Sequence, residues 1–212
     1  MLYIISTPIG NLKDITLRSI DILKSIDILL CEDTRKSGIL LKELGITNKP
    51  ELVSFYDEVE TQKVPYVIKN LKAGKEIGLI SDAGTPLLSD PGWKLVKKCQ
   101  EMGLVYTALP GPSAVINALV LSGLPMGRFT YLGFLSKKTG ERKNILKKYR
   151  NIEGSKVVYE SPLRVEKLIK EIKEIYGEKT EIRILREMTK KFEEIKKDWD
   201  GEKRGEVVVV FN

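Results

Sequence analysis

Short apolar runs, each about the length of a β-strand, alternate along this chain with segments whose apolar residues recur at helical spacing. In the first half the apolar runs are residues 2–6, 26–31, 77–81 and 105–109, and the helical segments are 15–24, 36–44, 64–73 and 93–102. Such alternation leaves few folds open, because parallel strands need helical crossovers between them. The sequence therefore predicts an α/β fold with a largely parallel sheet.

A second series of strands and helices follows Pro112. The predicted strands are residues 129–133, 156–159, 182–186 and 206–211, and the predicted helices are 114–121, 141–149 and 165–175. Two successive sheets imply two domains, each with its own core, and a cleft between them. We predict an N-terminal α/β domain in residues 1–112 and a C-terminal α/β domain in residues 113–212.

The 212 residues of the chain include no histidine. That absence excludes Ser/His/Asp hydrolysis, HExxH metalloenzymes, Cys/His zinc sites and a histidine general base. The two cysteines, Cys31 and Cys99, are far apart and form no CxxC motif, so we expect both to be reduced and buried. No metal site is predicted.

The net charge of +7 is unevenly distributed. Acidic and basic residues balance in residues 1–112, so the whole excess lies in residues 113–212. This asymmetry is typical of a protein with a polyanionic partner, although a lysine-rich or thermophilic surface gives a similar pattern.

No apolar window approaches the ~20 residues of a membrane-spanning helix and no signal core follows Met1, so we expect a cytoplasmic protein with no membrane contact.

The loops after the first strands contain candidate functional groups, since open α/β sheets bind ligands beyond the carboxyl ends of their strands. Pro8 stands in the first of these loops, which a simple turn would also explain. After the second strand, Glu32, Asp33 and Arg35 leave the sheet together. Asp33 or Thr34 would serve as a helix cap, whereas Arg35 is suited to bind phosphate or carboxylate.

A longer loop, residues 81–92, follows the third strand and exceeds what a simple connection needs. Its small residues would let a ligand approach the backbone, and Asp90 followed by Pro91 is typical of an N-cap with proline at the first helical position. After the fourth strand, Ser113 is placed to cap a helix. The chain has no GxG and no GxxxxGK motif, so it lacks the fingerprints of dinucleotide enzymes and of phosphate-loop NTPases.

Charged residues also follow two strands of the second half. Arg164 stands in the first turn of a helix, where its charge opposes the helix dipole, and this favours a role other than stability. Arg186 and Glu187 follow the next strand, and an ion pair within the domain is the alternative explanation in each case. Residues 137–150 are predominantly basic, so this run is either a solvated helix face or a surface that contacts phosphates.

In order and spacing, these loops resemble the tetrapyrrole-methylase superfamily, and most specifically its ribosomal RNA small-subunit methyltransferase I family. The resemblance covers nearly the whole chain. The segments concerned are TPIGNL (7–12), DITLR (14–18), EDTR (32–35), SDAGTP (81–86), SDPG (89–92), LPGPSA (109–114), YESP (159–162) and REMTK (186–190). Each segment is weak alone, but together they are highly specific.

The resemblance implies two α/β domains, with S-adenosylmethionine bent into the cleft between them and held largely by backbone groups. At the matching positions the cofactor-binding residues would be Pro8, Ile9, Ala83, Gly84, Thr85, Leu88, Ser113, Ala114 and Tyr159. The substrate-binding residues would be Glu32, Arg35, Arg164, Arg186 and Glu187. The candidate catalytic residues Asp33, Glu160 and Lys190 would lie on the same substrate side.

The implied reaction is an in-line displacement, in which a cytidine ribose 2'-hydroxyl of small-subunit (16S) rRNA attacks the methyl group of the cofactor. The enzyme would contribute mainly by aligning the two groups, and no metal is required. Because a hydroxyl is a poor nucleophile, a base or a cation near the developing alkoxide would help; the candidates, in order, are Asp33, Glu160 and Lys190. The implied partner is rRNA or the assembled 30S subunit, and the resemblance also implies a homodimer.

The chain departs from the family pattern in two places. Members usually have a Tyr-His-Glu segment where this chain has Tyr56, Asp57 and Glu58, so Asp57 either takes the role of that histidine or the role is absent. Many members continue beyond the last strand as a small helical domain, whereas this sequence ends at Asn212, and we expect that difference to affect RNA affinity rather than methyl transfer.

Two alternative functions remain open on the sequence. One is a methylase of the same fold that acts on a tetrapyrrole or corrin precursor. The charge excess in the second half and the EDTR and YESP segments favour the RNA substrate over that alternative. The other is a non-catalytic RNA-binding module that uses residues 137–150, and this alternative would leave the cofactor loops unexplained.

Overall fold

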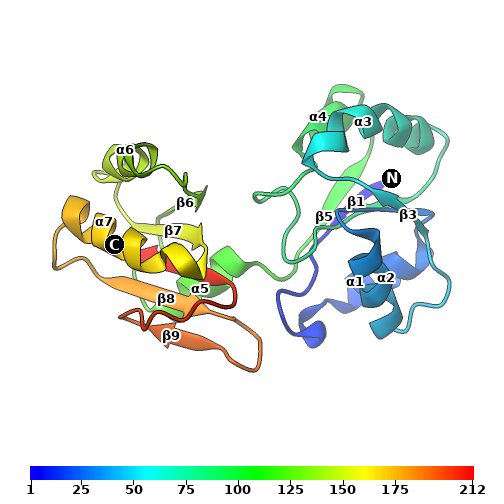
Figure 1. Cartoon of the computed structure of the whole chain (residues 1–212). Coiled ribbons are helices and arrows are strands. Elements are labelled where there is room, and N and C mark those ends of the chain that lie inside the picture. The colour runs from blue at the N-terminus through cyan, green and yellow to red at the C-terminus, as the bar shows by residue number, and fades with distance from the viewer. The chain divides into compact units, whose positions relative to one another are not determined.

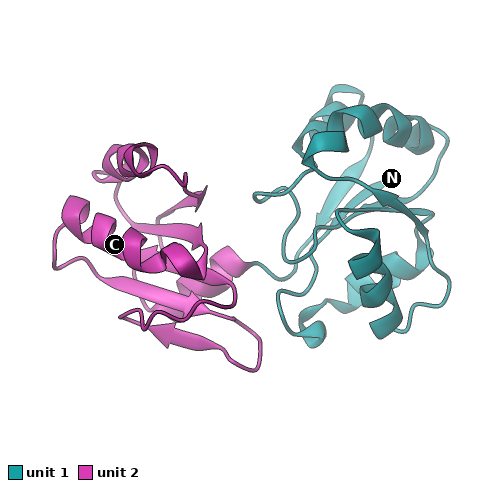
Figure 2. Ribbon diagram, in the orientation of Figure 1, with its two compact units in different colours: residues 1–113 teal, residues 114–212 magenta.

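The computed structural model describes all 212 residues, which divide into two compact units, residues 1–113 and residues 114–212 (Figure 2). Each unit contains one five-stranded sheet and helices that pack on it. This mixed architecture confirms the predicted α/β fold class. The division between the units falls after Ser113, one residue beyond the predicted boundary after Pro112. No helix has the length and apolar character needed to cross a bilayer.

Unit 1 is built on a wholly parallel sheet with the strand order β3-β2-β4-β1-β5 (Figure 1). Its elements are β1 (Leu2–Ile5), η1 (Leu12–Asp14), α1 (Leu17–Ser25), β2 (Ile28–Cys31), α2 (Thr34–Glu43), β3 (Glu51–Ser54), α3 (Asp57–Lys72), β4 (Ile77–Leu79), α4 (Trp93–Glu101) and β5 (Tyr106–Leu109). Because all the strands point the same way, their carboxyl ends lie at a single edge of the sheet.

Helices cover both faces of this sheet. Successive residues of β2 alternate between two core clusters, because side chains of a strand point to opposite faces. Helices α3 and α4 contribute to one cluster, which includes Cys99, and helices α1 and α2 contribute to the other, which includes Cys31. Both cysteines are free and buried, as predicted. Burial on both faces makes β1, β2 and β4 continuous apolar runs, which is why they are visible in the sequence.

Unit 2 has a mixed sheet with the order β6-β7-β10-β8-β9 (Figure 1). Its elements are α5 (Ala114–Ser122), β6 (Phe129–Phe134), α6 (Thr139–Tyr149), β7 (Ser155–Glu160), η2 (Pro162–Arg164), α7 (Val165–Tyr176), β8 (Ile182–Arg186), β9 (Glu194–Lys196) and β10 (Val207–Phe211). Only β6 and β7 pair in parallel; β10 is antiparallel to both of its neighbours, and β9 is antiparallel to β8. The largely parallel arrangement therefore holds for unit 1 and not for unit 2.

The core of unit 2 also lies on both faces of its sheet. Val158, Ile184 and Val209 share one cluster with α6 and α7. The alternate strand residues Val157 and Leu185 are buried as well, and α5 packs against β7, β8 and β10. The central strand β10 is entirely buried.

Two short strands, β3 and β9, were not predicted. Both lie at sheet edges. In β3 only Val53 is buried, and β9 has just three residues with none fully buried. Edge strands with polar side chains lack the apolar run that identifies the central strands.

Helix α3 begins earlier than predicted, whereas α4 begins at Trp93 as predicted but has a different N-cap. Helix α3 begins at Asp57 rather than at residue 64, and it includes Pro65, whose ring would more often mark a first turn. The predicted cap at Asp90 is wrong, because the N-cap of α4 is Gly92, with φ = 126° and no side-chain cap of its own. The buried carboxylate of Glu60 on α3 accepts hydrogen bonds from the backbone N–H groups of Gly92 and Lys94, each at 3.0 Å, and so caps α4 from the neighbouring helix.

Candidate active site

The loops after β1, β4 and β5 are joined into one structure at the carboxyl edge of the unit 1 sheet. Thr7 and Gly84 exchange backbone hydrogen bonds of 2.9 and 3.0 Å. The Thr7 hydroxyl donates to the Ser81 carbonyl at 3.2 Å, and the Thr85 hydroxyl donates to the Pro112 carbonyl at 2.9 Å. Predicted cofactor-binding positions in all three loops therefore lie in one connected region.

The backbone of these loops has unusual conformations. Gly84 has φ = 80°, and the loop also holds Leu87 and Ser89 at φ = 71° and 69° although neither is glycine. A Cβ atom on Gly111 would come within 2.8 Å of the Ser6 Cβ, so a side chain there would separate the loops. Strained backbone of this kind is concentrated at ligand sites.

The side chains at the candidate cofactor positions of unit 1 are small or apolar. They are Pro8, Ile9, Ala83, Gly84, Thr85, Leu88 and Ser113. Ala83 is exposed, and Leu88 and Ser113 are half-buried. An edge of this composition offers backbone N–H and C=O groups rather than charged side chains, which fits a cofactor held mainly by backbone contacts. The remaining two candidates, Ala114 and Tyr159, belong to unit 2.

Both oxygens of the Asp33 carboxylate, which follows the end of β2, accept hydrogen bonds. Its Oδ1 accepts from the Arg35 backbone N–H at 2.9 Å and from Arg35 Nε at 3.0 Å, and its Oδ2 accepts from Arg35 Nη2 at 2.8 Å. Asp33, rather than Thr34, is therefore the cap of α2. The Arg35 side chain and backbone hold the pKa of Asp33 well below its usual range, so this carboxylate is a weak base.

A group of carboxylates also lies at this edge. Glu32 Oε1 accepts from the Asp82 backbone N–H at 3.0 Å. Burial raises the pKa of Glu32 against the lowering effect of that hydrogen bond, and the charges of Asp82 and Asp57 raise it further. Burial and the charge of Glu32 raise the pKa of Asp90 to about 6. Asp57, which stands where the family usually has histidine, thus adds negative charge next to a predicted substrate residue.

A cavity of ≈ 240 Å³ lies between α2 and these loops. Its lining includes Pro8 and Ser81 from the loops and Lys36 and Ser37 from α2. The Lys36 ammonium lies 2.5 Å from Asp82 Oδ2. Sequence reasoning missed both Lys36 and the raised pKa of Asp90, because neither residue is distinctive until the loops are folded against α2.

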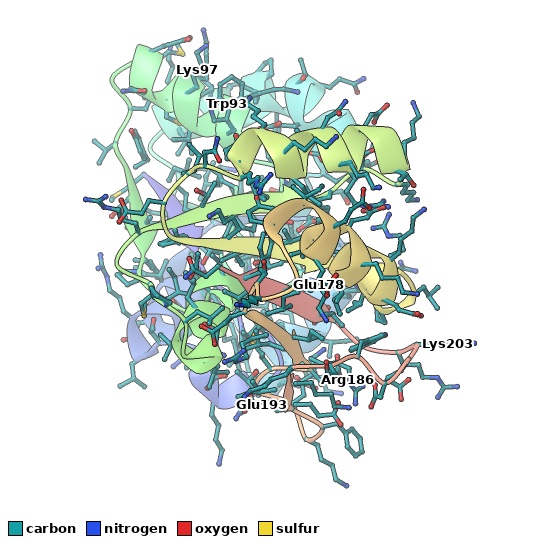
Figure 3. The ribbon with its side chains drawn as sticks, turned by 90° about the vertical axis from the view of Figure 1, so that its left-hand side faces the viewer. Trp93, Lys97, Glu178, Arg186, Glu193 and Lys203 are labelled. Atoms are coloured by element: carbon teal, nitrogen blue, oxygen red, sulfur yellow. The ribbon has the colours of Figure 1, made fainter.

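Strand register aligns the charged candidates of unit 2 along one edge of its sheet. Glu160 at the end of β7 and Arg186 at the end of β8 are both opposite Val207, the first residue of β10. Arg186, labelled in Figure 3, donates through Nε to Glu194 Oε2 at 2.9 Å. The structure therefore brings Glu160 and Arg186 to the same end of β7 and β8, the two strands that flank β10.

Lys190 and Glu187 form a second charged group beside this edge. Lys190 Nζ lies 2.9 Å from Glu187 Oε1 and 2.9 Å from Glu206 Oε2. Burial alone would lower the pKa of Lys190, but the two carboxylates outweigh it and raise that pKa. Burial likewise opposes ionisation of Glu187, yet the Lys190 ammonium and the Glu206 N–H lower its pKa. Lys190 is therefore a protonated cation near neutral pH.

Glu160 and Arg164 form a buried pair with unused hydrogen-bonding atoms. The Glu160 side chain is 0% exposed; its Oε1 forms an ion pair with Arg164 Nη2 at 2.5 Å and accepts a hydrogen bond from the Ser161 N–H at 2.7 Å. Glu160 Oε2 has no partner, and neither have Nε and Nη1 of Arg164. Since buried polar atoms are almost always paired, these unpaired atoms make Glu160 and Arg164 candidates for a functional role. The pair also explains why an arginine stands at the start of α7.

Aromatic rings surround Tyr159, the predicted cofactor residue of β7. Its ring centroid lies 5.2 Å from that of Tyr131 and 5.3 Å from that of Phe134, both on the neighbouring strand β6. Phe134 is 63% exposed and directly opposite Tyr159 in the strand register. These three rings provide a surface suited to an aromatic ligand.

Not all the basic side chains of residues 137–150 are exposed and free to contact phosphate. Arg142 is 1% exposed, and its guanidinium donates to both oxygens of Glu171 at 2.5 and 2.7 Å and to the Ser136 carbonyl at 2.8 Å. Lys143 pairs with Glu174 at 2.6 Å. Part of the charge that suggested a phosphate-binding patch therefore joins α6 to α7 instead.

A family model described as Tetrapyrrole (Corrin/Porphyrin) Methylases matches residues 1–199. The chain is 41% identical to the Ribosomal RNA small subunit methyltransferase I of Vibrio cholerae serotype O1, over 99% of the chain and 76% of that protein. It is 43% identical to the protein of the same name from Mycoplasmopsis pulmonis, over 91% of the chain and 85% of that protein.

Two solved structures share the fold at low sequence identity. Diphthine synthase aligns with a TM-score of 0.77 at 17% identity, over 99% of this chain and 88% of that chain. Uroporphyrin-III-C-methyltransferase from Thermus thermophilus aligns with a TM-score of 0.69 at 16% identity, over 100% of this chain and 93% of that chain. The connected loops of unit 1, the match over residues 1–199 and the relatives at about two-fifths identity agree. The chain belongs to the tetrapyrrole methylase family.

Proposed function

We propose that this chain is an S-adenosylmethionine-dependent methyltransferase that modifies the 2'-oxygen of a cytidine ribose in small-subunit (16S) ribosomal RNA. The relatives at about 40% identity, named for action on small-subunit rRNA, support the RNA substrate over a tetrapyrrole. The structural observation on which the chemistry rests is the buried Glu160 carboxylate, whose Oε2 has no partner within the chain.

The loops at the carboxyl edge of unit 1, together with Ala114 and Tyr159, would hold the cofactor. When bound, S-adenosylmethionine supplies an electrophilic methyl group. The chain's own task is to orient the ribose hydroxyl toward that methyl group and to exclude competing water, and orientation alone contributes several kcal/mol in such reactions. Glu32, Arg35, Arg164, Arg186 and Glu187 are the residues we assign to holding the RNA.

Among the candidate bases, Glu160 is the best placed to accept the proton of the ribose hydroxyl. Asp33 is weakly basic because Arg35 occupies both of its oxygens. Lys190 is protonated and is suited instead to stabilise negative charge on the attacking oxygen. Glu160 Oε2, unlike either oxygen of Asp33, has no hydrogen-bond partner, and the ion pair with Arg164 fixes the orientation of the Glu160 carboxylate.

Transfer of labelled methyl from S-adenosylmethionine to small ribosomal subunits that lack native modification tests this function. Mapping should locate the label on the ribose of a single cytidine. The Glu160→Gln variant should lower kcat by about 10²–10⁴-fold, the range for loss of a general base, with little change in cofactor affinity.

Asp33→Asn is the matched control for that experiment, since it also neutralises a candidate carboxylate at a strand end. We expect it to lower kcat by much less than Glu160→Gln. Wild-type turnover in Glu160→Gln would remove Glu160 as the base. Labelling of a porphyrin or corrin precursor in place of rRNA would overturn the assigned substrate.

The partner and the setting are part of the same proposal. We assign rRNA or the assembled 30S subunit as the partner, action in the cytoplasm, and a homodimer as the working form; the homodimer is supported by the resemblance to the family. Sedimentation of the purified protein at several concentrations tests the dimer.

A further inference from the structure

A groove between α3 and α4 lies in unit 1 apart from the loops described above. Its cavity of ≈ 310 Å³ is lined by Thr61, Val64, Pro65, Trp93, Lys94, Lys97, Lys98 and Glu101. This volume is at the lower end of the roughly 300–1,000 Å³ of small-ligand sites. Because α4 follows a strand of a parallel sheet, its first residue starts on the side of the carboxyl edge, where the candidate site residues also lie.

Trp93 dominates the exposed surface of this groove. Its side chain is 61% exposed, although a large aromatic side chain is normally buried in a soluble protein. Figure 3 shows Trp93 and Lys97 near each other on α4, and Lys97 Nζ lies 5.2 Å from the centre of the Trp93 ring. An exposed indole with a cation beside it is a typical stacking surface for a nucleobase.

The lysines of α4 make the groove cationic. Lys94, Lys97 and Lys98 occupy two successive turns, and no acidic residue stands in the first turn of the helix. The Lys94 ammonium donates to Thr61 at 2.9 Å, and Lys98 pairs with Glu101 at 3.1 Å, whereas the Lys97 ammonium contacts the indole. The buried Glu60 carboxylate caps the positive end of α4 and lies 3.7 Å from the Lys94 ammonium. Lys97, which forms no ion pair and lies over the indole, is therefore the lysine of this groove best suited to contact a phosphate.

The same charges argue against a second copy of the chain as the occupant. Two copies that met at this face would bring the lysines of one copy against those of the other. An RNA strand instead supplies both groups that the groove matches, namely phosphates for the lysines and a flat base for the indole.

We propose that an unpaired nucleotide of the substrate RNA stacks on Trp93 while the lysines of α4 contact the adjacent phosphates. This inference rests on the proposed function, because it takes RNA as the substrate, and it assigns a contact that positions the strand rather than a catalytic group.

The chain has only two tryptophans, Trp93 and Trp199, which permits a direct test. In the Trp199→Phe protein Trp93 is the single reporter, and we expect its fluorescence to be quenched as a single-stranded RNA oligonucleotide from the small-subunit rRNA is titrated in. In the Trp93→Phe protein, where Trp199 is the reporter, the emission should change little although the RNA still binds. Unchanged Trp93 emission at saturating RNA would overturn the proposal.

Affinity measurements on matched variants give a second test. Trp93→Ala should weaken RNA binding about 5- to 150-fold, as for loss of one stacked base, while Trp93→Phe retains most of the affinity. Lys97→Gln should reduce the slope of log K against log salt by about 0.7, and Lys24→Gln on α1, which packs on the opposite face of the sheet, should leave it unchanged. Equal RNA affinity in Trp93→Ala and the wild type would contradict the proposal.

Failure of this inference is distinguishable from failure of the proposed function. Wild-type methylation of rRNA together with an unresponsive Trp93 would reject the stacking contact alone. Quenching of Trp93 by RNA without any methyl transfer would support the contact and reject the reaction. A Trp93 emission that shifts with protein concentration and a change in sedimentation, both without RNA, would identify a second copy as the occupant and reject the contact.

Discussion

At the scale of single residues, side chains with similar chemistry have quite different environments. Asp33 and Glu160 are both carboxylates at strand ends and both pair with an arginine a few residues away. Asp33 is bound on both oxygens at the surface, whereas Glu160 is buried with one oxygen unpaired. Sequence gives the residue type and the strand end, but it does not distinguish these environments, because they depend on how the following helix packs.

Asp90 gives a prediction about pH at this scale. Its folded-state pKa of about 6 exceeds the 3.8 of an ordinary aspartate, so the folded chain binds its proton more tightly than the unfolded chain does. Ionised Asp90 therefore destabilises the fold, and this cost grows as the pH rises from about 4 to above 6. Asp90→Asn should raise the free energy of unfolding by about 1–2 kcal/mol at pH 8, with a gain that shrinks as the pH falls below 6.

Urea denaturation at pH 8, 6 and 4.5 measures this effect. Asp21→Asn, on the exposed surface of α1, is the matched control and should give the same small change at each pH. A gain in Asp90→Asn that does not depend on pH would show that the carboxylate is not the cause.

At the scale of elements, the sequence predicts those strands and helices whose burial produces a periodic apolar pattern. It misses features that depend on contacts between elements. The apolar strands β2 and β10 and the amphipathic helix α7 are close to their predicted bounds. The start of α4 at Trp93 is predicted, but its cap is not, because the capping carboxylate of Glu60 comes from α3, more than thirty residues earlier in the chain. The local sequence around Gly92 therefore gives no indication of which residue caps the helix.

The pairing of α6 with α7 gives a prediction at this scale. Arg142 and Glu171 form a buried bidentate ion pair with side chains 2% and 5% exposed. Arg142→Gln should lower the free energy of unfolding by about 3–5 kcal/mol, because it leaves the Glu171 carboxylate buried without its cation. The double variant Arg142→Met with Glu171→Leu should recover most of that loss, since neither charge then remains.

Urea denaturation of the three proteins provides the comparison. Lys143→Gln, which breaks the more exposed pair between the same two helices, is the control and should cost less than about 1 kcal/mol. If Arg142→Gln is as mild as Lys143→Gln, the buried pair does not hold the helices together.

At the scale of the whole molecule, each unit has a separate core and sheet, and this supports independent folding. The sequence predicts the two sheets and the approximate division between them. It does not predict that the second sheet is mixed, because an apolar run such as VVVVF is equally compatible with parallel and with antiparallel neighbouring strands. Strand direction depends on the connections, which sequence patterns constrain weakly.

Removal of β10 tests this independence. A chain that ends at Glu206 loses the strand that pairs with both β7 and β8, so unit 2 should lose its protection from hydrogen exchange while unit 1 keeps its own. Mass spectrometry of peptides from each unit measures this, with a chain lacking only Asn212 as the control. Equal loss of protection in both units would show that unit 1 depends on unit 2.

The position of β10 at the centre of its sheet also has a consequence for synthesis on the ribosome. Unit 1 has all of its strands once residue 109 has been made, and it can complete its sheet while translation continues. In unit 2, β7 and β8 leave the ribosome with open edges, and these edges are joined only when residues 207–211 arrive. The ends of β7 and β8 that carry Glu160 and Arg186 are joined through β10 only at that step, so unit 1 can complete its sheet well before unit 2 does.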